Sequence, residues 1–120
     1  ALKGNVAMNT IHWVEKRRTH RLRSSLPTYY ESTIEGKHGN GLTHDISESG
    51  LRMTLEEFIP KFARVLVKIN LKSDKLIVLN GKVRWAQRVA YSPRYQVGLE
   101  FEDVALDTRR SIAEYVYSHR

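Results

Sequence analysis

Two short stretches of the sequence carry residues whose types and spacing could hold a phosphate-bearing ligand. The first is RRTHR at residues 17–21, which places Arg17 and Arg21 four residues apart. An arginine side chain presents a planar fork of donors that matches a phosphate or the edge of a base. Arg84 and Arg88 show the same spacing inside an expected strand, so the pair becomes informative only beside a second group.

The second stretch is DISESG at residues 45–50, which contains Asp45, Ser47 and Gly50. Each residue has a simple reading as turn chemistry, because Asp and Ser bond their own backbone and Gly tolerates a positive φ. A hairpin would bring the arginine-rich stretch back beside this turn. We therefore expect Asp45 and Ser47 to be held outward, facing the arginines of the first stretch.

Length and charge limit the class of protein. A chain of 120 residues is sufficient for one domain with a single core. Its net charge of +7 favours partners that carry phosphates, including nucleotides, nucleic acids and anionic membranes. The sequence has no cysteine, which excludes disulfides and thiolate chemistry, and no apolar run long enough to span a membrane.

Alternating apolar residues predict a mainly β fold. Six strands are expected at residues 26–33, 42–47, 51–55, 63–71, 76–90 and 95–101. In the fourth of these, Val65, Val67, Ile69 and Leu71 fall on one face. Short antiparallel strands joined by tight turns indicate a small closed barrel.

Two local features of the last third of the chain also yield predictions. Asn80-Gly81 interrupts the long fifth strand and predicts a bulge or local turn. Asp107 is expected to cap a helix over residues 108–118, on which Ile112, Tyr115, Val116 and His119 form an apolar stripe. That stripe should pack on the barrel or on a partner.

Taken together, these residues resemble the PilZ family of bacterial receptors for cyclic di-GMP. RRTHR matches the family's RxxxR motif, and DISESG matches its [D/N]xSxxG motif. The strands GKVRWAQRV and YQVGLEF resemble the closing strands, with Gly98 and Phe101 in the G-x-x-F ending. The resemblance implies a six-stranded, split-barrel-like domain over residues 16–120 with a C-terminal helix. Residues 1–15 would be a leading segment or linker.

The resemblance also implies a ligand site. Arg17 and Arg21 would wrap cyclic di-GMP, while Asp45 and Ser47 hold its opposite side and Gly50 keeps the backbone close. The chemistry agrees, since an arginine fork matches O6 and N7 of guanine, and a carboxylate accepts from its N1–H and N2–H donors. The charged neighbours of the motif, namely Lys16, Arg18 and Arg23, are secondary candidates. Whether one nucleotide binds or a stacked pair stays open.

Catalysis has little support in the sequence. His44 and Asp45 are adjacent in an expected strand and should point to opposite faces, which prevents a hydrogen-bonded relay. The five histidines have no paired-ligand spacing, so no metal is assigned. The expectation is a non-enzymatic sensor without a cofactor, whose ligand is cyclic di-GMP.

The resemblance implies that ligand binding is transmitted to a covalently linked domain or to a separate protein partner. The downstream process would be exopolysaccharide synthesis, for example of cellulose, or motility. A cytoplasmic bacterial location follows, including the cytosolic part of a membrane protein. DNA and RNA are not expected partners. The alternatives are a basic barrel that binds single-stranded nucleic acid through Tyr29 or Tyr30, and a PilZ-like interaction module without ligand.

Overall fold

The computed structural model describes residues 21–71 and 75–118. These residues form six strands and one helix, as expected. Their bounds are β1 (Leu22–Ser32), β2 (His38–Ile46), β3 (Gly50–Leu55), β4 (Arg64–Leu71), β5 (Lys75–Arg88), β6 (Tyr95–Glu102) and α2 (Leu106–Ser118). The strand ends differ from the predictions by a few residues, and the largest differences are at β1 and β2, each of which begins four residues earlier.

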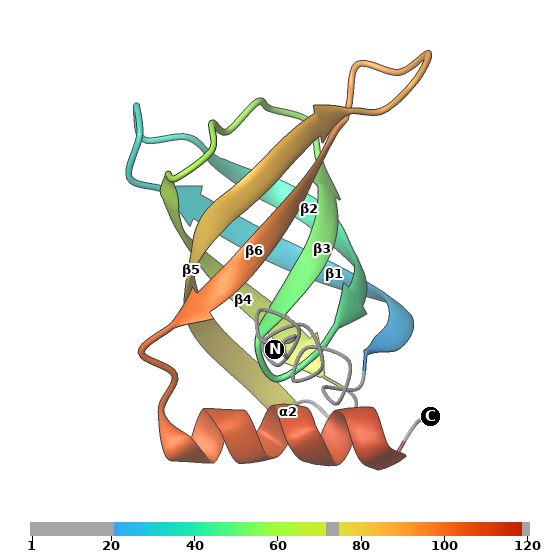
Figure 1. Ribbon diagram of the computed structural model, residues 1–120, viewed down its shortest axis with the longest axis vertical. Helices are drawn as coiled ribbons and strands as arrows, with labels where there is room; N and C mark the ends of the chain where they lie inside the picture. Colours follow the sequence, from blue (N-terminus) through green and yellow to red (C-terminus); the bar gives the residue numbers. More distant parts are fainter. Residues whose placement is uncertain (1–20, 72–74, 119–120) are drawn as a thin grey trace, which may run out of the picture.

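The six strands close into an antiparallel barrel in the order β1-β2-β3-β6-β5-β4 (Figure 1). Closure pairs β1 with both β2 and β4, so the sequence-distant strands β3 and β6 become neighbours. The mainly β, closed-barrel prediction is therefore confirmed. The hairpin between β5 and β6 extends beyond one end of the barrel, and α2 lies across the other end (Figure 1).

The barrel interior is filled by the apolar face of each strand. On β4 the predicted residues Val65, Val67, Ile69 and Leu71 are all buried. One polar pair joins them inside, where the hydroxyl groups of Thr28 and Thr43 lie 2.6 Å apart. Thr28 also donates to the Leu26 carbonyl oxygen at 2.9 Å, which leaves both hydroxyl groups satisfied, as burial requires.

The helix α2 packs on the barrel through the predicted stripe, since Ile112, Tyr115 and Val116 are buried; His119 lies outside the described residues. The prediction for Asp107 was wrong in detail, because the helix begins at Leu106 and Asp107 lies in its first turn. There its negative charge still favours the helix N-terminus. Within residues 21–71 and 75–118, no helix has the length and hydropathy needed to cross a membrane.

Tyr30 supplies one polar anchor between the barrel and the segment after β3. Its ring is buried, and its hydroxyl group donates to the Glu57 carboxylate. Burial, followed by this hydrogen bond to Glu57, raises the pKa of Tyr30. The folded protein therefore holds this proton more tightly than the unfolded chain does. The stabilisation is complete below the usual tyrosine pKa of about 10 and decreases as pH rises above it.

We expect Tyr30→Phe to lower the free energy of unfolding by about 1.5 kcal/mol, the scale of one hydrogen bond to a charged group. The melting temperature should fall by roughly 6 °C. Tyr29→Phe is the matched control, because Tyr29 is partly exposed and its ring faces the Lys68 ammonium group and the His38 ring. Equal melting temperatures for the two variants would contradict a stabilising role for the Tyr30 hydroxyl group.

Candidate ligand-binding site

The motif DISESG forms the turn between β2 and β3. The Ser47 amide donates to the Gly50 carbonyl oxygen at 2.9 Å, and the Ser47 hydroxyl group accepts from the Ser49 amide at 3.2 Å. The turn is tied to the next strand because the Phe101 amide donates to the Ser49 carbonyl oxygen at 2.9 Å. These bonds make the end of this hairpin rigid.

Two details of this turn differ from the sequence-based expectation. Ser47 does not point outward, since it is fully buried and its hydroxyl group is used within the turn. Gly50 does not adopt a positive φ; Gly36 is the glycine with that conformation in the described chain. A Cβ at Gly50 would instead lie well within 3.0 Å of the Leu99 carbonyl oxygen. Gly50 is therefore required by the close approach of β3 and β6.

Asp45 does point outward, at the penultimate position of strand β2, and it is held between two arginines. Its Oδ1 atom accepts from Arg21 Nη1, and its Oδ2 atom accepts from Arg52 Nε at 2.8 Å. The Asp45 side chain is only 13% exposed, compared with 49% for Arg21. The carboxylate is therefore fixed in direction, while one of its two arginine partners lies at the solvent boundary.

The strand register extends this cluster into a row across the outer face of the barrel. Asp45 lies opposite Arg23 on β1 and opposite Arg52 on β3. Arg52 lies opposite Gly98 on β6, and Gly98 lies opposite Trp85 on β5. The Trp85 indole covers Gly98 so closely that any Cβ there would overlap it, yet the Trp85 residue is still 40% exposed. The Asp45 row therefore contains, in order across the strands, Arg23, Asp45, Arg52, Gly98 and the partly exposed ring of Trp85.

Three irregularities in strand pairing border this row. The register shifts between Arg23 and Leu26 on β1, between Thr43 and Asp45 on β2, and between Val83 and Trp85 on β5. Bulges of this kind re-aim side chains and are frequent beside functional sites. The predicted irregularity at Asn80-Gly81 was wrong, because pairing is regular there and the bulge falls at Arg84 instead.

The bulge on β2 also changes which neighbours the His44 side chain can reach. Simple alternation placed His44 on the face opposite Asp45, but the extra residue lets its ring reach Thr54, with Nε2 2.6 Å from the Thr54 hydroxyl oxygen. Asp45 bonds the arginines rather than His44. The three residue types of a catalytic triad are therefore near one another without forming a relay, since Ser47 is buried in its turn.

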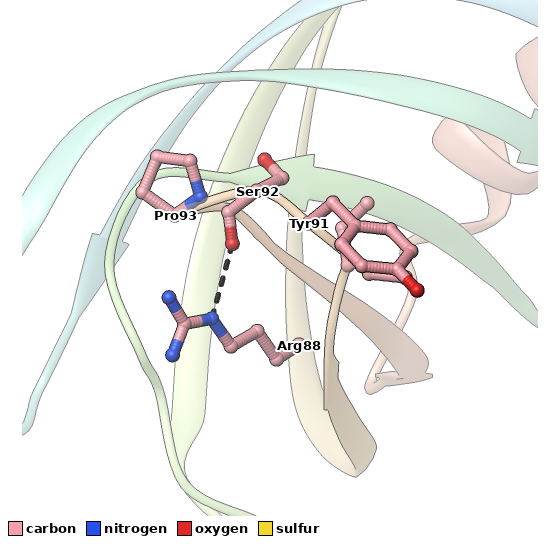
Figure 2. Close-up of a pocket in the computed structure, with 6 residues that line it drawn as sticks. Arg88, Tyr91, Ser92 and Pro93 are labelled. Carbon is pink, nitrogen blue, oxygen red and sulfur yellow. Dashed lines mark hydrogen bonds between the residues drawn. The ribbon is translucent and has the colours of Figure 1, made fainter.

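Two hollows lie further along the same strands. A groove of about 460 Å³ is lined by residues of β2, β3 and β6, including Leu42, His44, Thr54 and Gln96. Its Gln96 accepts a bond of 3.4 Å from Arg52 Nη1, so the groove borders the Asp45 row. The second hollow belongs to the β5–β6 hairpin alone, where Arg88 Nε donates to the Ser92 carbonyl oxygen at 3.0 Å (Figure 2).

Of the residues that the sequence singled out, the structure brings Arg21, Arg23 and Asp45 together on one outer face. Lys16, Arg17 and Arg18 lie outside the described residues. Sequence reasoning missed Arg52 and Trp85, which complete the row. Arg52 could have been found from the turn, because a tight hairpin that pairs Ile46 with Leu51 must also place Asp45 opposite Arg52 when the strands are regular.

The structure is a closed antiparallel barrel with one C-terminal helix and a carboxylate held between two arginines on its outer face. The family model described as "PilZ domain" matches residues 15–118. The chain therefore belongs to the PilZ domain family, as its two motifs indicated. A comparison with curated proteins gave no significant match.

Solved structures share this fold at low sequence identity. The inhibitor of motility MotI/DgrA of Bacillus subtilis has a TM-score of 0.73 and 17% identity, over 85% of this chain and 50% of that chain. The PilZ domain of YcgR from Escherichia coli, with c-di-GMP, has a TM-score of 0.68 and 13% identity, over 87% and 91%. The PilZ domain of CeSA from a cellulose-synthesizing bacterium has a TM-score of 0.61 and 15% identity, over 82% and 96%.

Proposed function

We propose that this domain is a non-enzymatic receptor that binds cyclic di-GMP on the outer face of the barrel, at the row that contains Asp45. One observation carries the proposal. Asp45 is a nearly buried carboxylate that a rigid hairpin aims outward between two arginines, Arg21 and Arg52. Such a group accepts hydrogen bonds from a fixed direction, and the cations beside it suit a ligand with phosphates.

Each side chain of the row has a role that its chemistry supports. Asp45 accepts from N1–H and N2–H of a guanine, while Arg21 and Arg23 contact phosphates and the O6 and N7 edge. Arg17 completes the RxxxR motif, with Lys16 and Arg18 as further contacts. Trp85 offers an exposed ring on which a second base can stack.

The remaining two motif residues act through the shape of the turn. Ser47 bonds the turn internally and Gly50 allows β3 to approach β6, so both hold Asp45 in position. They support the ligand without a side-chain contact of their own. Of the three motif residues, Asp45 alone contacts the ligand, and Ser47 and Gly50 maintain the turn that positions it.

The family and its solved structures support the choice of ligand. YcgR of Escherichia coli is solved with c-di-GMP, and so is MrkH of Klebsiella pneumonia, at 19% identity and a TM-score of 0.63. We propose residues 16–120 as the receptor domain and residues 1–15 as a leading segment. Binding would reach a linked domain or a partner in the bacterial cytoplasm, with exopolysaccharide synthesis or motility as the output.

Calorimetric titration of the protein with cyclic di-GMP tests the proposal. We expect saturable binding and a higher melting temperature in excess nucleotide, because a ligand of the folded state stabilises it. Absence of both would refute it. A single-stranded oligonucleotide that binds with steep salt dependence, without competition from the dinucleotide, would establish the nucleic-acid alternative instead. Of the two tyrosines that the alternative would use as stacking platforms, Tyr30 is buried and only Tyr29 reaches the surface.

A further inference from the structure

Arg52 bridges three strands at the centre of the proposed site. From β3, its Nε atom donates to Asp45 Oδ2 on β2 at 2.8 Å, and its Nη1 atom donates to Gln96 Oε1 on β6 at 3.4 Å. Its side chain is 35% exposed, less than that of Arg21. A guanidinium group held at two of its nitrogens has little freedom to turn, and it transmits that restriction to the carboxylate.

The two arginines that share Asp45 are anchored differently. Arg52 lies inside β3, with register partners on both sides, Asp45 and Gly98. Arg21 precedes the first residue of β1 and is half exposed. An exposed ion pair contributes at most about 1 kcal/mol, so Arg21 can exchange Asp45 for a ligand phosphate at small cost. Arg52, rather than Arg21, is the arginine that keeps its bond to Asp45 when a ligand is bound.

A carboxylate has about four lone-pair positions on its two oxygens. In the structure Arg21 uses one on Oδ1 and Arg52 uses one on Oδ2. If Arg52 stays, the plane of the carboxylate is fixed, and a base must present its donors along the directions that remain. Guanine presents two adjacent donors, N1–H and N2–H, whereas adenine presents the acceptor N1 beside the donor N6–H, which repels a carboxylate.

We propose that Arg52 is a positioning residue that sets the preference of this site for guanine, by holding the Asp45 carboxylate in the orientation that accepts two adjacent donors. The inference rests on the proposed function. Arg52 lies two positions after the DISESG motif. In this role it contributes to selectivity although it does not contact the base.

Two substitutions separate positioning from charge. Arg52→Met removes both the charge and the fork, and Arg52→Lys keeps the charge but cannot hold Asp45 and Gln96 together. We expect the ratio of affinities for cyclic di-GMP and cyclic di-AMP to fall by about tenfold in both variants, the scale of one bidentate base contact. The matched controls are Arg64→Met and Arg64→Lys, because Arg64 Nε donates to Glu102 Oε1 at 3.0 Å away from the row. Their ratio should equal that of the wild-type protein.

The measurements are calorimetric titrations with both dinucleotides and a melting curve for each variant. Wild-type selectivity in folded Arg52→Lys would overturn the inference and leave the proposed function intact. A wild-type protein that binds both dinucleotides equally would do the same. A wild-type protein that binds neither would remove the proposed function itself, and the inference with it.

The side-chain Nε–H resonance of Arg52 in ¹⁵N-edited NMR spectra provides a readout that does not depend on any variant. We expect slow exchange with water in the free protein, and the same protection after cyclic di-GMP is added. Loss of this protection on binding would show that Arg52 leaves Asp45, which contradicts a positioning role.

Discussion

Replacing Asp45 with alanine is expected to weaken cyclic di-GMP binding by about 10- to 100-fold, which corresponds to the 1–3 kcal/mol of a good bidentate base contact. The substitution removes the acceptor for the guanine donors. It also frees Arg21 and Arg52 from their ion pairs, and the freed cations attract the phosphates. That second effect is of the size of a surface charge interaction, about 0–1 kcal/mol, so the loss of the base contact prevails.

Glu102→Ala is the matched control for this prediction. Glu102 is also a partly exposed carboxylate between two cations, Arg64 at 3.0 Å and Lys82 at 3.8 Å, but it lies outside the Asp45 row. The change in net charge is identical, and binding should stay within about twofold of wild type because exposed charges are weakly coupled. Equal losses in both variants would mean that net charge, rather than base recognition, governs the affinity.

Arg21→Ala should produce a loss of similar size, about 10- to 100-fold, if Arg21 makes a charge-assisted contact to the ligand. The structure clarifies why this residue is available. Its bond to Asp45 is partly exposed, so the free protein loses little when the arginine turns to the nucleotide. Unchanged affinity in Arg21→Ala would mean that Arg21 pairs with Asp45 but makes no contact with the ligand.

The strand periods of the sequence were sufficient to predict the fold, because the buried apolar residues of β4 alternate, as do Val97, Leu99 and Phe101 of β6. Regions of local backbone irregularity were harder. The bulge at Arg84 has no glycine or proline to mark it, whereas Asn80-Gly81 has the residues of a turn and is regular. Bulges depend on how two strands meet, so composition within one strand does not locate them.

For the candidate site too, some residues could be predicted from the sequence and others could not. Asp45 and Arg21 could be paired from two motifs and a hairpin. Trp85 could not, because its place beside Gly98 depends on the β5–β6 register and on the bulge that shifts it. The outward direction expected for Ser47 also failed, since the turn uses its hydroxyl group internally. A residue type that suits both a turn and a ligand does not reveal from sequence which of them it serves.

Gly50→Ala is expected to destabilise the protein by about 3 kcal/mol or more, the upper range for overpacking a buried position. The obstacle to the new Cβ is the carbonyl oxygen of Leu99, which belongs to the backbone of β6 and cannot rotate away. Relief requires β3 and β6 to separate at Gly50 and Glu100, where they are paired. The melting temperature should fall by roughly 10 °C or more.

Gly36→Ala separates this steric effect from the loss of glycine freedom. Gly36 has a φ of +64° and nothing within 4 Å of a new Cβ, so its substitution introduces backbone strain alone, about 1–2 kcal/mol. Thermal and denaturant unfolding of both variants give the comparison. A Gly50→Ala protein as stable as wild type that no longer binds cyclic di-GMP would mean that this glycine serves the approach of the ligand. A large loss of stability instead means that the glycine five residues after Asp45 is required by the packing of β3 against β6, which then places the carboxylate for recognition.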